Sequence, residues 1–208
     1  MLEPDVTLTD FAITLICGIF AAELWRQRGP FAGAFVRLFT FPGLAALVAG
    51  IVHGYVPDTD AGIGSALWVM SLLAVGAASA AMWELVVRIT LKKRALRAAL
   101  GLIGLAWLGY AWWVFAVDRS FAIAVYQYAA ATVALLIVLA IGRSRGTVSH
   151  AGFGIAGLIV ALVAGVLQQL EFSPVPGLLT HNAFFHVLQI AALAALFITA
   201  ARLRSGVR

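Results

Sequence analysis

Seven long apolar stretches constrain this chain more than any other feature of its sequence. Each reaches the roughly twenty residues that an α-helix needs to cross about 30 Å of hydrocarbon. The predicted spans cover residues 8–25, 34–55, 62–87, 98–117, 121–141, 148–170 and 181–201. The connections between them are too short to hold a soluble domain. The sequence therefore predicts a single all-α domain over residues 1–208, an integral membrane bundle of seven transmembrane helices.

The composition supports a membrane protein. Hydrophobic residues make up 63% of the 208 residues and charged residues only 11%, and the mean hydropathy is +1.02. Soluble domains are about half apolar and about a quarter charged. The isoelectric point near 10 does not indicate nucleic-acid binding, because the basic residues lie in short connections beside the spans, where such residues set topology.

The basic residues predict the orientation of the bundle. Of the 14 Lys and Arg residues, all but Arg119 fall on one predicted side. That side holds Arg26, Arg28, Arg37, Arg88, Lys92, Lys93, Arg94, Arg97, Arg143, Arg145, Arg202, Arg204 and Arg208. The positive-inside rule then predicts an outer N-terminus and a cytoplasmic C-terminus.

Some polar residues within the spans have a simple structural explanation. Glu23 precedes Arg26 by three residues and Glu84 precedes Arg88 by four, spacings that allow ion pairs on one helix. Gln168 is expected to bridge two helices by a hydrogen bond.

A second polar set falls in the outer half of the predicted bundle. Asp10 opens the first span, His53 closes the second, and His181, Asn182 and His186 open the seventh. Three of the four histidines therefore share one leaflet although they lie far apart in the sequence. Polar groups at such depth are costly unless they face a partner, a cavity or a ligand.

On the seventh helix one face is expected to be polar. Asn182, His186 and Gln189 share it, whereas His181 lies roughly 140° away from His186.

The polar set admits several interpretations. Thr7-x-x-Asp10 also fits a capping box at the start of the first span, and Thr180 and Asn182 could cap the seventh. Imidazoles from different helices beside a carboxylate are the ligands that Zn²⁺ requires, and such an ion could activate water for hydrolysis. A proton relay, or a polar ligand bound without metal, would use the same side chains.

At these residues the chain resembles the CREST superfamily of seven-span membrane hydrolases, which includes alkaline ceramidases and the progestin/adiponectin receptors. The family has a histidine late in span two and an H-x-x-x-H pair opening span seven. His53 matches the first, and His186, within Phe185-His186-Val187-Leu188, matches the second of the pair. The Thr-Asp, His-Gly and His-Asn…Phe-His…Gln segments look most like a related group of uncharacterised bacterial membrane proteins, which implies a bacterial cytoplasmic (inner) membrane.

The resemblance implies a zinc site and hydrolysis of an amide. His53, His181 and His186 are then the candidate metal ligands, with Asp10 an alternative to His181, and Asp10 and Asn182 are the candidate catalytic side chains. The chain departs from the family in three places. Asn182 replaces the first histidine of the pair, Ala49 replaces a serine, and span three has no acid in its outer half.

Two functional hypotheses follow. The first is a CREST-like membrane protein with a polar, zinc-binding site in the outer leaflet that hydrolyses a lipid amide or ester. The second is a non-catalytic membrane subunit or small-ligand binder that uses the same cluster structurally. Expected partners are membrane lipids and, under the second hypothesis, other membrane protein subunits.

Overall fold

A computed structural model describes residues 1–27, 29, 31–148 and 150–203, and within these ranges the secondary structure is helical. The helices are α1 (Pro4–Trp25), α2 (Ala32–Tyr55), α3 (Gly62–Thr90), α4 (Lys93–Ala116), α5 (Phe121–Ser144), α6 (Ala151–Gln169) and α7 (His181–Leu203). All seven are long and apolar enough to cross a membrane, which confirms the prediction of seven long apolar helices.

The helices differ from the predicted spans mainly at their ends. Helix α1 begins at Pro4, four residues before the predicted start, because proline fits the first turn of a helix, where its missing N–H is not needed. Helices α3 and α4 come within three residues of each other, at Thr90 and Lys93. Since α1 starts so early, Asp10 lies in its second turn, and the capping-box interpretation of Asp10 is wrong.

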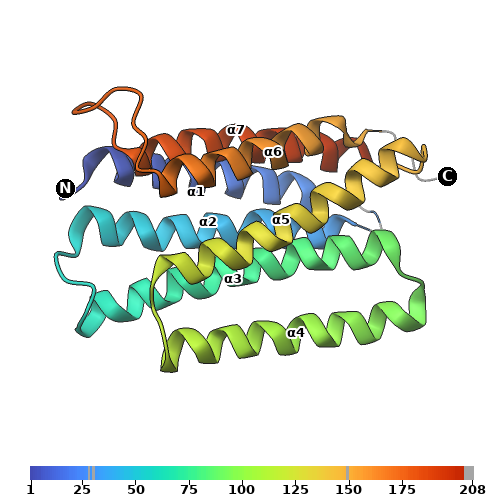
Figure 1. The fold of residues 1–208 in the computed structure, drawn as a ribbon, viewed down its shortest axis with the longest axis horizontal. Coiled ribbons are helices and arrows are strands. Elements are labelled where there is room, and N and C mark those ends of the chain that lie inside the picture. Colours follow the sequence, from blue (N-terminus) through green and yellow to red (C-terminus); the bar gives the residue numbers. More distant parts are fainter. Residues whose placement is uncertain (28, 30, 149, 204–208) are drawn as a thin grey trace.

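Six helices form a closed ring, and α4 lies outside it. Around the ring the helices follow the order α1, α2, α3, α5, α6 and α7, and α7 packs on α1 to close it. Among the described residues α4 packs on α3 alone. Figure 1 shows the start of α1 and the end of α7 at opposite ends of the bundle, and α4 set apart along its edge. Side chains from all six helices of the ring therefore face its centre.

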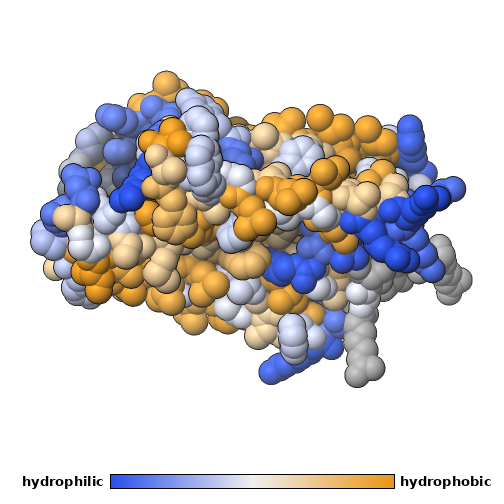
Figure 2. Space-filling model, turned by 90° about the horizontal axis from the view of Figure 1, so that it is seen from below, coloured by the Kyte–Doolittle hydropathy of each residue, from blue (hydrophilic) through white to orange (hydrophobic). Residues whose placement is uncertain are grey.

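The surface has the distribution that a bilayer requires. Figure 2 shows a broad hydrophobic middle, with hydrophilic residues gathered at the two ends and most strongly at the C-terminal end. Large apolar side chains such as Leu15, Ile19, Leu105 and Ile137 are exposed along the helices. Of the basic residues predicted at this end, Arg28, Arg204 and Arg208 lie outside the described residues.

Glycines allow α1 and α2 to approach closely. A Cβ atom added at Gly50 would lie 3.0 Å from the Cβ of Asp10, and one added at Gly54 would lie 3.0 Å from the Cγ2 of Thr7. Gly50 and Gly54, four residues apart on one face of α2, therefore form the close contact with α1. Helices α6 and α7 meet in the same way, since a Cβ at Gly157 would lie 2.6 Å from the Ala192 carbonyl oxygen.

Candidate functional site

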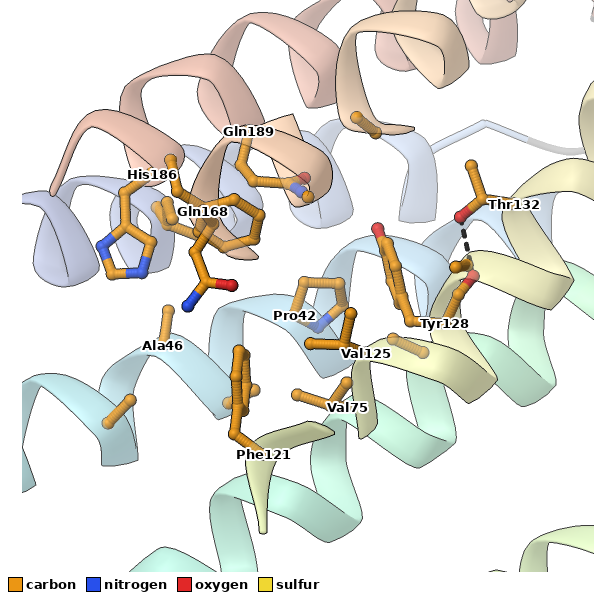
Figure 3. A pocket seen from close by; sticks show the side chains of 18 of the residues that line it. Pro42, Ala46, Val75, Phe121, Val125, Tyr128, Thr132, Gln168, His186 and Gln189 are labelled. Carbon is orange, nitrogen blue, oxygen red and sulfur yellow. Dashed lines mark hydrogen bonds between the residues drawn. The ribbon is translucent and has the colours of Figure 1, made fainter. Parts of the chain in front are cut away.

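A cavity of about 450 Å³ occupies the centre of the six-helix ring. Each ring helix contributes to its wall, which is largely apolar. The polar side chains in the wall come from five helices and are Asp10, Ser71, Tyr126, Tyr128, Thr132, Gln168, Gln169, His186 and Gln189. Figure 3 shows His186 and Gln168 together at one side of the cavity, while Tyr128 and Thr132 lie at the other. The volume of the cavity falls within the ~300–1,000 Å³ of typical small-molecule sites.

Asp10 and His186 form the centre of the polar side. The Nε2 atom of His186 lies 3.5 Å from Asp10 Oδ1, and its Nδ1 atom lies 3.0 Å from the hydroxyl of Thr9. Two neighbouring residues of α1 therefore hold the two nitrogens of one imidazole. An imidazole that donates one N–H and accepts at its other nitrogen can hold and transfer a proton between such partners.

The Asp10 carboxyl group is only partly satisfied by this contact. Its side chain is 2% exposed, and Oδ2 has no hydrogen-bond partner among the described residues. The 3.5 Å to His186 is longer than a direct N–H···O hydrogen bond of about 2.7–3.2 Å. A buried carboxyl oxygen without a donor is costly. The wall of the cavity thus contains an acceptor that a bound molecule with a donor group would satisfy.

Local contacts fix the start of α7 and the direction of its polar face. The Thr180 hydroxyl accepts a hydrogen bond from the Ala183 N–H at 3.2 Å, as predicted for a cap, and the Thr180 N–H donates to Asp5 Oδ2 at 2.8 Å. His186 and Gln189 line the cavity. Two of the three residues predicted on the polar face of α7, His186 and Gln189, therefore point into the ring.

Asn182 lies at the edge of this site. Its Oδ1 accepts a hydrogen bond from Gln168 Nε2 at 3.2 Å. Gln168 lines the cavity, but Asn182 does not. The predicted bridge from Gln168 to another helix is confirmed, and Asn182 positions a cavity residue.

The other two histidines are placed differently. The Nδ1 atom of His53 lies 2.7 Å from Glu3 Oε2, and the Glu3 N–H also donates to the His53 carbonyl at 3.1 Å. His53 therefore joins the end of α2 to the start of α1. His181, the first residue of α7, is half-buried and does not line the cavity.

The donor groups do not assemble as a zinc site requires. Zinc takes three or four ligands at about 2.0–2.3 Å, whereas no group of three or more His, Cys, Asp or Glu side chains within the described ranges is arranged to hold a metal ion. His53 contacts the carboxylate of Glu3, and His186 contacts that of Asp10, so the two histidines do not share a carboxylate. Zinc binding by these residues stays a prediction.

Sequence reasoning missed two partners of the histidines, Glu3 and Thr9. Glu3 lies in the first residues of the chain, outside the predicted first span, and a threonine inside an apolar helix usually bonds its own backbone. Thr9 does so as well, at 2.9 Å from the Asp5 and Val6 carbonyl oxygens. The one available signal was the adjacency of Thr9 to Asp10.

The cavity reaches the surface of the bundle between α5 and α6. Three residues line the cavity and are also exposed: Tyr126 on α5, Val166 on α6, and Leu170 directly after α6. Near the loop that joins them the two helices pack tightly, since a Cβ at Gly154 would lie 3.1 Å from Leu139 Cδ1. They diverge towards the other end, as Figure 1 shows. The opening lies near the end of the bundle where α5 begins and α6 ends.

Comparison with known proteins gives a family but no function. No curated protein and no solved structure matches the chain. One family model matches residues 6–205, which spans the seven helices from the first turn of α1 to the end of α7. The chain belongs to this family, a family of unknown function designated DUF6962.

Proposed function

We propose that this protein is a membrane-embedded binder of an amphiphilic, lipid-like molecule that carries a hydrogen-bond donor. The observation that supports this most is the buried acceptor Asp10 Oδ2, without a partner among the described residues, in the wall of an otherwise apolar cavity. An alkyl chain would occupy the apolar part, and its donor group would lie beside Asp10 and His186. The opening between α5 and α6 would admit the molecule from the bilayer.

The charge of the site favours some head groups over others. Asp10 and His186 carry together no net charge as an ion pair or a neutral pair, and no arginine or lysine lines the cavity. An ammonium or hydroxyl group would donate a hydrogen bond to Asp10, whereas a carboxylate has no proton to donate and would bring an uncompensated negative charge into the cavity. We therefore expect amines and alcohols to bind and fatty acids to be rejected.

Three probes that share one alkyl chain test this proposal. Thermal unfolding of the purified protein in neutral detergent is measured with dodecylamine, dodecanol or dodecanoate. Dodecylamine and dodecanol are expected to raise the melting temperature, and dodecanoate to leave it unchanged. In Asp10→Asn the affinity for dodecylamine should fall about ten- to hundredfold, because a hydrogen bond to a charged group is lost. Equal stabilisation by all three probes, in both proteins, would refute the proposal.

Hydrolysis of a lipid amide or ester is a second candidate, favoured by the pairing of an imidazole with a carboxyl group in the cavity. Such a pair can take a proton from water and return it to a leaving group. Cleavage of para-nitrophenyl dodecanoate or of dodecanoyl para-nitroanilide that disappears in His186→Ala would support it. Its CREST-like, zinc-dependent form further requires stoichiometric zinc that His53→Ala and His186→Ala both lose; wild-type protein without such metal would exclude that form.

For the membrane itself we propose the bacterial cytoplasmic membrane, with the N-terminus outside and the C-terminus in the cytoplasm. The excess of basic residues at the C-terminal end of the bundle supports this orientation. The site would then lie in the outer leaflet.

A further inference from the structure

A second polar cluster lies at the opposite end of the bundle, between α2 and α3. Arg37 donates from Nε to Glu84 Oε2 at 2.9 Å and from Nη2 to Oε1 at 2.5 Å, and Arg88 donates from Nε to Oε1 at 2.7 Å. The predicted Glu84–Arg88 pair is thus confirmed and has a third member. Two guanidinium groups share one carboxylate, which leaves one positive charge in excess.

The three side chains are unequally covered. The Glu84 side chain is 11% exposed, against 45% for Arg37 and 29% for Arg88. Nη1 of Arg37 and both Nη atoms of Arg88 donate to no residue in the described part of the chain. Since each guanidinium has five N–H donors, both retain donors for another acceptor, while the carboxylate is largely used.

The depth of the cluster matches the head-group region of a bilayer. Arg37 lies five residues after Ala32, where α2 begins, and Glu84 lies six residues before Thr90, where α3 ends. At 1.5 Å per residue these positions are roughly 8–9 Å from the helix ends. Of the nine acidic residues in the chain, the other one at this end is Glu23, beside Arg26 at 4.0 Å. An anion approaching from the membrane surface therefore meets a positive field.

We propose that Arg37 and Arg88, held in place by Glu84, bind the phosphate group of an anionic lipid. Guanidinium groups bind phosphate through paired N–H donors with defined geometry, and Glu84 positions both of them. This site is separate from the cavity and independent of the function proposed above.

Lipid binding to the purified protein tests the proposal. The dissociation constants for phosphatidylglycerol and phosphatidylcholine, which share their acyl chains, are measured by native mass spectrometry from neutral detergent. Phosphatidylglycerol is expected to bind the wild type about tenfold more tightly, and Arg88→Gln to lose about that factor, because each lost charge-assisted bond weakens binding by at least this much. Arg37 would still bind Glu84 with two hydrogen bonds in this variant.

The matched control is Arg145→Gln, which removes the same charge from an exposed position at the same end. It should bind like the wild type; equal weakening in Arg88→Gln and Arg145→Gln, or equal binding of both lipids to the wild type, would overturn the proposal. If Arg88→Gln does not fold, Arg88→Lys, which keeps the charge but not the fork, should still bind more weakly than Arg145→Gln. Inorganic phosphate could also displace the lipid, with an affinity that falls in Arg88→Gln. That result would support a phosphate site at Arg37 and Arg88 but overturn its assignment to a lipid in favour of a soluble anion.

Discussion

At the scale of single residues, the contacts of the histidines decide what the site can do. The sequence predicted that Asp10 and His186 lie in the same half of the bundle, and the structure places them 3.5 Å apart. The contact of His53 with Glu3, rather than with His186, was not predicted from the sequence. Leaflet follows from topology, but the partner of a side chain depends on how each helix is rotated about its axis. In a membrane that rotation is poorly encoded, because lipid and core are both apolar.

Gly50→Ala is predicted to disturb the site without changing any polar group. The added Cβ would lie 3.0 Å from both Asp10 Cβ and Phe11 Cε1, so α1 must shift away from α2. Overpacking of this kind costs about 1–3 kcal/mol, which exceeds the ~1 kcal/mol that alanine gains over glycine in a helix. We expect a lower melting temperature and weaker binding of dodecylamine.

Gly18→Ala is the control for this prediction. Gly18 lies on α1 with no heavy atom within 4 Å of an added Cβ, so alanine there should leave the melting temperature unchanged or raise it. A Gly50→Ala protein as stable as Gly18→Ala, with unchanged binding, would contradict the close packing of α1 on α2 beside Asp10.

At the scale of helices, α4 depends on a small number of contacts with α3. The Tyr110 hydroxyl donates to the Leu72 carbonyl at 3.0 Å, and Trp107 Nε1 donates to the Leu73 carbonyl at 3.4 Å. Val114 is the one buried residue of α4. Trp107 and Tyr110 thus attach α4 to α3.

Gly76→Ala is predicted to weaken that attachment. An added Cβ would lie 2.3 Å from Tyr110 Cε1, and a rigid aromatic ring cannot move aside as the end of a flexible chain could. We expect faster limited proteolysis in the connection between α3 and α4 and a lower melting temperature. Gly104→Ala, on α4 with no atom within 4 Å of its Cβ, should behave as the wild type. Equal proteolysis of the two variants would show that Tyr110 does not hold α4.

At the scale of the whole molecule, the number of helices was predictable and their arrangement was not. Hydropathy identifies a span because some twenty apolar residues are needed to cross the bilayer, and all seven spans were found. The ring of α1, α2, α3, α5, α6 and α7 could not be derived in the same way. Nothing in the sequence of α4, which is as apolar as α1, distinguishes it as the helix outside the ring. The central cavity follows from that arrangement, so it could not be predicted either.

The orientation of the whole bundle can be tested by labelling introduced cysteines in cells. The native Cys17 is 0% exposed, so the wild type should give little signal with a membrane-impermeant maleimide. Asp60→Cys and Arg145→Cys place exposed thiols at opposite ends of the bundle. With the N-terminus outside, as the basic residues predict, Asp60→Cys should react in intact cells and Arg145→Cys only after permeabilisation. The reverse pattern would place the cavity site in the inner leaflet and the Arg37–Glu84–Arg88 cluster in the outer one, where anionic lipids are less abundant.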